Sequence, residues 1–163
     1  PFTFTSLEED KVLEFTIKQY PEHNGVTAEL HKLKPGDELI LREPWGTIQY
    51  HGMGVFIAGG AGLTPFIAIF RRLWHDRKLT GNKLIFSNKT ARDVILEPEL
   101  QEMLGDDFIR VFTREKVEGH YHGRVNEGFL NDALKSFSQH FYLCGPKQFV
   151  LDVKKLLENC SEP

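Results

Sequence analysis

The residues best suited to bind a ligand lie in one glycine-rich stretch, 59–65, which reads Gly-Gly-x-Gly-x-Thr-Pro. A short apolar run, 55–58, precedes it and is typical of a strand buried on both faces. The glycines allow a sharp backbone turn with no side chains in the way. Thr64 can cap a helix with its hydroxyl, and Pro65 suits the first helical position. Such a turn presents bare N–H groups and the positive end of a helix dipole, which favours an anion.

The same stretch departs from two familiar phosphate-binding patterns. Its spacing is not Gly-x-Gly-x-x-Gly, and no Gly-Lys-Ser/Thr follows, so neither the Rossmann fingerprint nor the P-loop applies. On these residues alone, a tight turn that binds nothing is the alternative. The residues after the turn predict a helix with one apolar stripe, formed by Phe66, Ile69, Phe70, Leu73 and Trp74.

Composition narrows the class of protein. The chain has 163 residues, of which 40% are hydrophobic and 26% charged, as in an ordinary globular protein of one or two small domains. A net charge of −3 argues against a general nucleic-acid binder. We see no signal peptide and no apolar run long enough to span a bilayer, and we expect a cytoplasmic protein without a membrane span.

Metal chemistry finds little support in the sequence. The two cysteines, Cys144 and Cys160, do not form a Cys-x-x-Cys motif, and their number weakly suggests a reducing compartment. His120 and His122 lie on one side of an extended loop but lack a third ligand nearby. We therefore expect no metal site, and we interpret this loop as solvated.

The first 50 residues read as β-rich because apolar and polar residues alternate. Alternation over residues 2–5 and 13–18 predicts strands with one buried face, and residues 39–41 predict another strand. Thr27 is expected to cap a short helix, which a Pro-Gly pair ends. We place a domain boundary near residue 50, so that residues 1–50 form the first domain.

From residue 51 to residue 163, strands and helices alternate, which predicts a parallel sheet. After the first strand, further strands are expected at 84–87, 108–113 and 140–144. Helices are expected from Pro98, over 129–134 and at the chain's end. In open α/β sheets, ligands bind outside the carboxyl ends of the strands. The four segments at these ends should form one site, and they are 59–65, 87–92, 113–114 and 144–146.

Two motifs in this part resemble those of the ferredoxin–NADP reductase-like flavoenzymes, a family that includes cytochrome b5 reductase and bacterial flavodoxin reductases. One is the glycine stretch, and the other is Cys144-Gly145-Pro146. The resemblance implies that the nicotinamide cofactor's pyrophosphate is held by Gly59, Gly60, Gly62, Thr64 and Pro65. It also implies that Cys144 lies close to the reacting nicotinamide, where we expect packing and positioning rather than a nucleophile.

The N-terminal residues resemble the family's flavin-binding half. Pro1-Phe2-Thr3 is similar to the motif Arg-x-Tyr/Phe-Ser/Thr without its arginine, which implies that Phe2 packs on the isoalloxazine and Thr3 bonds near its reactive nitrogen. The next strand would contact flavin through Thr16, Lys18 and Tyr20. The segment Gly25-Val26-Thr27 resembles the one that holds the flavin pyrophosphate at a helix start.

The family's flavin domain is a closed barrel, and only its later strands are recognisable here. The expected fold is therefore a partial antiparallel β-barrel, with its N-terminal strands absent, followed by an α/β parallel-sheet nicotinamide-binding domain. A half barrel exposes unpaired edges, so we expect further chain upstream or a covering subunit.

The sequence does not decide whether the hydride donor is NADH or NADPH, and we prefer NADPH. Arg114 and Arg124 resemble residues that hold the 2′-phosphate in bacterial flavodoxin reductases, and the segment carrying Arg92 is basic. Against this, Arg92-Asp93 together with the later Pro98-Glu99-Leu100 resembles the NADH-using cytochrome b5 reductases.

The resemblance implies an oxidoreductase that passes hydride from NAD(P)H to FAD and then electrons to a separate carrier, such as flavodoxin, ferredoxin or a cytochrome. Phe2, Thr3, Thr64 and Cys144 would position the two rings. Arg71 and Arg72 could meet an acidic carrier, although a solvated helix face is the preferred interpretation. Two alternatives stay open: a flavin-free nucleotide-binding regulatory module, and an electron-transfer subunit of a larger complex.

Overall fold

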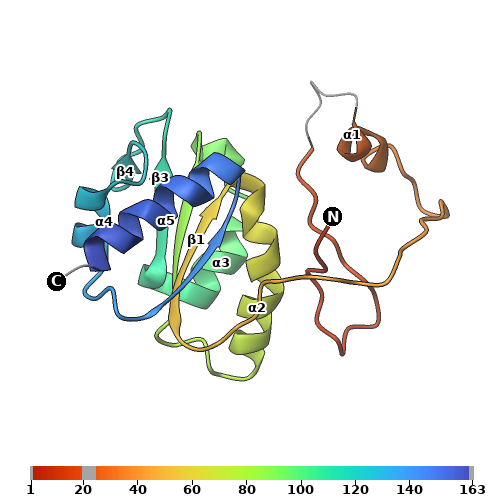
Figure 1. The fold of residues 1–163 in the computed structure, drawn as a ribbon. Helices are drawn as coiled ribbons and strands as arrows, with labels where there is room; N and C mark the ends of the chain where they lie inside the picture. The colour runs from red at the N-terminus through yellow and green to blue at the C-terminus, as the bar shows by residue number, and fades with distance from the viewer. Residues whose placement is uncertain (1, 20–24, 162–163) are drawn as a thin grey trace.

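Five parallel strands form one sheet in the second part of the chain (Figure 1). The structure is a computed structural model that describes residues 2–19 and 25–161. The strand order across the sheet is β4-β3-β2-β1-β5. The strands are β1 (Gly54–Gly59), β2 (Lys83–Asn88), β3 (Phe108–Phe112), β4 (Tyr121–His122) and β5 (His140–Cys144).

Helices cover both faces of this sheet, so that α5 lies in front of it and α3 behind it in Figure 1. One apolar cluster packs α2 and α3 on the sheet, and the other packs α4 and α5. The helices and short 3-10 turns are α1 (Val26–Leu30), η1 (Gly60–Leu63), α2 (Thr64–His75), η2 (Ala91–Asp93), α3 (Glu97–Leu104), η3 (Gly105–Asp107), α4 (Glu127–Ala133) and α5 (Lys147–Ser161).

The central strand β1 is buried along its whole length, as its apolar sequence predicts. Phe56 has no exposed surface, and its ring contacts Phe66 and Phe70 of α2 edge-on at centroid distances of 5.0 and 4.7 Å. The same ring stacks on Tyr142 of β5 at 4.3 Å. These aromatic contacts fix α2 against the middle of the sheet, and with it the turn that precedes the helix.

The parallel sheet and its four longer strands are confirmed, whereas two details of the α2 region were predicted wrongly. The N-cap of α2 is Leu63, and no side chain caps the helix, because the η1 turn leads straight into α2. The Thr64 hydroxyl instead donates to the carbonyl of Ala61 at 3.1 Å. Trp74 was expected on the buried stripe but is 48% exposed, since it lies in the last turn of α2, at the edge of the core.

The N-terminal part differs more from its prediction. Among its described residues no strand forms, and an isolated antiparallel bridge joins Phe4 to Phe15. Residues 39–41 are irregular, and Ile40 is 97% exposed. Alternating residues cannot form a strand without a neighbouring strand to bond to, so the partial barrel is not shown. The helix α1 is present, but Gly25 is its N-cap, and Thr27 lies inside it instead of capping it.

Along residues 2–19 and 25–161, no helix is both long enough and apolar enough to cross a membrane. The longest helix in that part of the chain is α5, with 15 residues.

Candidate functional site

A cavity of about 580 Å³ opens where β1, β2, β3 and β5 end. The strand register makes these ends level, because Gly59 pairs with Ser87, Ala58 with Cys144, and Ser87 with Val111. All four predicted strand-end segments contribute residues, which confirms that they gather around one cavity at this edge of the sheet. The cavity is lined by Lys18, Gly59, Gly60, Ala61, Gly62, Ser87, Asn88, Lys89, Thr113, Cys144, Gly145, Pro146 and Phe149.

The glycine turn fits against the end of β5 so closely that position 62 has no space for a side chain. A Cβ atom on Gly62 would lie 2.3 Å from the carbonyl oxygen of Cys144 and 2.5 Å from the amide nitrogen of Gly145. A Cβ atom on Gly145 would lie 3.1 Å from the amide nitrogen of Gly59. Gly60 has φ +53°, a left-handed conformation that glycine adopts without strain. The two motifs therefore interlock through their backbones, and this close approach requires glycine at position 62.

Asn88 carries the clearest sign of a ligand. It is 4% exposed, and neither its side-chain nitrogen Nδ2 nor its oxygen Oδ1 has a hydrogen-bond partner among the described residues. Its backbone carbonyl is satisfied, since it accepts from the Thr113 amide at 2.9 Å. Buried polar side chains nearly always have partners, and an unpaired one costs about 1–3 kcal/mol. An unpaired amide in the wall of a cavity fits a ligand group that both donates and accepts.

One lining residue, Phe149, lies outside every predicted site segment. Asn88 lies inside the predicted segment 87–92 but was not singled out there, although it is a polar residue at the carboxyl end of a strand. Phe149 lies in the first turn of α5, where its ring would be 2.9 Å from a Cβ atom on Gly59, and it lines the cavity.

Cys144 is half-buried at the cavity wall, and burial raises the pKa of its thiol, although a hydrogen bond with the Gly145 backbone opposes the shift. A raised pKa keeps the thiol protonated near neutral pH, and the thiol is a poor nucleophile compared with a thiolate. The environment of Cys144 therefore suits packing and positioning.

Lys18 is the one described residue of the N-terminal part that lines the cavity. Its ammonium lies 3.2 Å from the Asp93 carboxylate, which also accepts from the Thr90 amide and hydroxyl at 3.0 Å each. Burial acts to raise the pKa of Asp93, but the hydrogen bonds from Thr90 and Lys18 outweigh it and lower that pKa. The carboxylate stays charged and holds Lys18 beside the cavity.

The structure does not bring the other predicted residues to this cavity. Thr64 and Pro65 begin α2 behind the glycine turn, and Phe2, Thr3 and Thr16 do not line it. The exposed side chains of Arg92, Arg114 and Arg124 lie outside its lining. Gly25 and Val26 line a separate cavity of about 680 Å³, next to Thr27. Pro1 and Tyr20 lie outside the described residues. These flavin-side and phosphate-side assignments stay predictions.

A parallel α/β sheet with a glycine cradle at its carboxyl edge defines a nucleotide-binding type of domain. Residues 56–155 match the family model described as "Oxidoreductase NAD-binding domain". The chain therefore belongs to this family, in agreement with its resemblance to the ferredoxin–NADP reductase-like flavoenzymes.

Curated relatives share most of this chain. NADH-cytochrome b5 reductase 1 of Eremothecium gossypii is 31% identical over 176 residues, which cover 95% of this chain and 60% of the relative. NADH-cytochrome b5 reductase 3 of Mus musculus is 27% identical over 188 residues, which cover 92% of this chain and 62% of the relative. The chain thus spans about three-fifths of the length of these relatives.

Solved structures share the fold. The flavohem-like FAD/NAD binding domain of nitric oxide dioxygenase from Vibrio cholerae aligns with a TM-score of 0.80 at 17% identity, covering 99% of this chain and 72% of that one. A ferredoxin NADP+ reductase from Neisseria gonorrhoeae, with bound FAD and NADP, aligns with a TM-score of 0.77 at 21% identity, covering 97% and 71%.

The interlocked backbones predict that Gly62→Ala destabilises the chain by about 1–3 kcal/mol, because its methyl group would overlap the Cys144 carbonyl. Urea unfolding measures the change. Gly60→Asn in the same turn is the matched control. Asparagine tolerates the left-handed conformation, and no atom lies within 4 Å of the new Cβ. Equal destabilisation by both variants would contradict the interlock.

The unpaired amide predicts that Asn88→Leu makes the ligand-free chain about 1 kcal/mol more stable, since leucine removes an unsatisfied buried group of similar size. Asn82→Leu is the control. Asn82 is also buried, but its amide accepts from the Gly54 amide and donates to the Leu79 carbonyl, so this variant should be destabilised. A drop in the unfolding midpoint of both variants would show that Asn88 is satisfied.

The raised pKa of Cys144 predicts slow alkylation by iodoacetamide near neutral pH. The rate should increase only above the pH, about 8.5, at which an ordinary thiol ionises. A Cys160→Ser background leaves Cys144 as the reacting thiol, and mass spectrometry follows the adduct. Labelling at neutral pH as fast as that of glutathione would contradict a protonated thiol.

Proposed function

We propose that the cavity binds a nicotinamide dinucleotide, and that the whole protein is a flavin-dependent oxidoreductase passing hydride from this nucleotide to FAD. The observation that carries the proposal is the unpaired Asn88 amide beside a glycine cradle, in a chain that belongs to the NAD-binding oxidoreductase family. When bound, the nicotinamide supplies the hydride and the flavin accepts it, so the chain's own task is to bind and orient the two.

On the nicotinamide side, the proposed binding residues are those of the cradle. The turn presents the amides of Gly60, Ala61 and Gly62 at a helix start, which suits a pyrophosphate. Asn88 offers a donor and an acceptor, which suits a ribose hydroxyl or a carboxamide. Cys144 would pack beside the nicotinamide, and its neutral thiol adds no charge there.

On the flavin side, the proposed residues are Phe2, Thr3, Thr16 and Lys18, with Tyr20 and the segment Gly25-Val26-Thr27. Lys18 already lines the cavity, which supports the placement of a flavin at its N-terminal rim. We propose that residues 1–50 belong to a flavin-binding barrel and residues 51–163 to the nicotinamide domain. The exposed apolar side chains of the first part, such as Ile40 and Trp45, support a covered barrel wall.

We propose NADH as the preferred donor, against the preference for NADPH drawn from Arg114 and Arg124. The curated relatives cited above are named NADH-cytochrome b5 reductases. In addition, two carboxylates lie near the η2 turn: that of Asp93, and that of Glu115, which accepts from the Ala91 amide at 2.7 Å. Negative charge there disfavours a 2′-phosphate. The relatives' name also supports a cytochrome as the electron carrier, ahead of flavodoxin or ferredoxin.

A second candidate is a nucleotide-binding module without flavin. The observation in its favour is that Phe2, Thr3 and Thr16 do not line the cavity that Lys18 reaches. The two proposals differ in one property, which is whether the purified protein retains FAD.

The test loads the protein with FAD, removes oxygen, and follows the visible flavin band after addition of NADH or NADPH. We expect bleaching by both nucleotides, with NADH at least about ten-fold faster, a difference of about 1.4 kcal/mol. Asn88→Leu should weaken nucleotide binding by about ten-fold or more. Asn131→Leu, the same change at an exposed position of α4, should not. A protein that refuses FAD but binds NADH would favour the flavin-free module, and one that binds neither would contradict both.

A further inference from the structure

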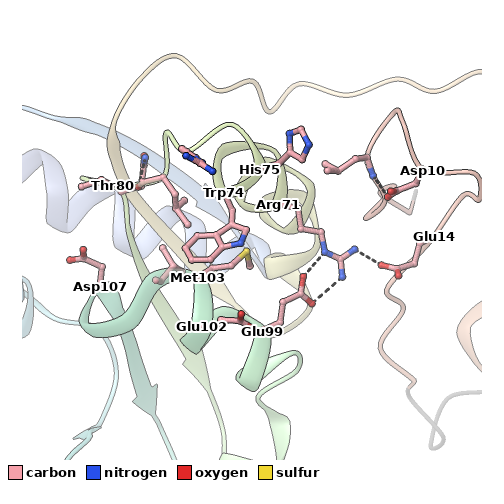
Figure 2. A pocket seen from close by; sticks show the side chains of 15 residues that line it. Asp10, Glu14, Arg71, Trp74, His75, Thr80, Glu99, Glu102, Met103 and Asp107 are labelled. Carbon is pink, nitrogen blue, oxygen red and sulfur yellow. Dashed lines mark hydrogen bonds and ion pairs between the residues drawn. The ribbon is translucent and has the colours of Figure 1, made fainter.

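Arg71 of α2 is hydrogen-bonded to three residues, one on α3 and two in the N-terminal part of the chain. Figure 2 shows its bonds to Glu99 and Glu14. Its Nε and Nη2 donate to the two carboxylate oxygens of Glu99 on α3, at 2.5 and 3.0 Å. Its Nη1 donates to the Glu14 carboxylate and to the Thr5 carbonyl, at 2.6 Å each. The expectation of a solvated helix face is therefore wrong for Arg71, since its side chain is only 20% exposed.

The N-terminal partners of Arg71 are themselves joined. The Thr5 hydroxyl donates to the Glu14 carboxylate at 2.7 Å, and the Thr5 amide donates to the Glu14 carbonyl at 2.8 Å. Thr5 is fully buried. Hydrogen bonds from Arg71 and Thr5 hold the pKa of Glu14 below its usual range, so the carboxylate is charged at neutral pH. A charged, bidentate guanidinium–carboxylate network of this kind is stronger than a neutral hydrogen bond.

Polar contacts carry much of the attachment of residues 2–19 to the α/β unit. Among the described residues, neither of the two apolar clusters of the sheet includes a residue before Tyr50. A cavity of about 1190 Å³ lies beside the network, between α2, α3 and residues 7–14. Figure 2 shows the Arg71 guanidinium between Glu99 and Glu14 at the rim of this cavity. Apolar packing therefore supports the contact between residues 2–19 and the α/β unit only in part, and the hydrogen bonds of Arg71 contribute more to it.

Arg71 connects two parts that the proposed reaction must hold together. On one side, α2 begins directly after the glycine turn, and Arg71 lies seven positions along from Thr64 in the same rigid helix. On the other side, Thr5 is two residues from Thr3 and three from Phe2. The proposed flavin contacts and the glycine cradle are thus linked through one guanidinium.

We propose that Arg71 is a positioning residue that sets the distance between the flavin-contacting segment and the nicotinamide cradle. The inference rests on the proposed function. Hydride transfer requires reacting atoms about 3–3.5 Å apart, and a displacement of 1 Å can slow a reaction about 100-fold. Arg71 touches neither ring in this assignment, and acts through Thr5 and α2.

The chain supplies a matched control in the next residue. Arg72 pairs with Glu9, which belongs to the same N-terminal loop as Glu14. Both partners of this pair are exposed enough to be screened by solvent, and none of the hydrogen bonds described for Arg72 and Glu9 involves Thr5. Arg72→Met removes a positive charge from the same helix face, so it tests whether the loss of any cation there would release the N-terminal segment.

The first experiment needs no flavin. In Arg71→Met, amide hydrogen exchange over residues 4–16 should become about ten-fold faster or more, while exchange in β1 and β2 stays unchanged. Arg72→Met should leave residues 4–16 protected. Glu14→Gln removes the charge from the opposite side of the network and should reproduce the Arg71→Met pattern at smaller amplitude. Unchanged protection of residues 4–16 in Arg71→Met would overturn the inference.

The second experiment measures flavin reduction by NADH in the FAD-loaded protein. Arg71→Met should lower the rate at saturating NADH by about 10–100-fold and leave the affinity for NADH unchanged. Arg71→Lys keeps the charge but not the fork of donors, and should fall between wild type and Arg71→Met. A normal rate in an Arg71→Met protein whose N-terminal segment has lost protection would overturn positioning. A wild-type protein that does not reduce flavin would instead reject the proposed function, and the exchange result would still decide whether Arg71 holds the segment.

Discussion

The structure depends on one backbone contact, between the glycine turn and the end of β5. The Cys144 carbonyl and the Gly145 amide occupy the space that any side chain at position 62 would need. The contact can exist only because β1 and β5 are neighbours in the sheet and end at the same level, with Ala58 opposite Cys144. Two motifs that are about eighty residues apart along the chain thereby become one cradle.

The rest of the domain keeps this contact in place. The aromatic cluster around Phe56 fixes α2, and α2 fixes the turn. The same edge of the sheet tolerates an unfavourable feature, the unpaired amide of Asn88. Among the described residues, Nε of Arg110 is the other buried side-chain atom without a hydrogen-bond partner. An unsatisfied buried group at a concave, glycine-lined edge lowers the stability of the fold by about 1–3 kcal/mol. In the proposed function, its donor and acceptor would bind the nucleotide.

Much of the proposed nicotinamide cavity was predictable, because parallel strands end at one edge and the glycine and Cys144-Gly145-Pro146 segments follow them directly in sequence. What the sequence could not predict depends on tertiary placement. The unpaired state of Asn88 and the position of Phe149 in the cavity wall follow from packing between distant segments. Likewise, the alternation in residues 2–18 suggested strands, but hydrogen-bonded neighbours, not alternation, make a strand. The pairing of Arg71 with Glu14 also depends on tertiary placement, and no local sequence pattern indicates it.

Backbone and side-chain amide chemical shifts of the labelled protein, titrated with NADH, measure most directly where a nicotinamide nucleotide binds. We predict shifts concentrated at the amides of the glycine turn, at the Asn88 side-chain amide, and at Gly145. We also predict that the Asn88 side-chain signals lose these shifts when Gly62→Ala disrupts the contact between the glycine turn and β5. Shifts confined to the larger cavity beside Trp74, or no shifts at all, would contradict the proposed binding site.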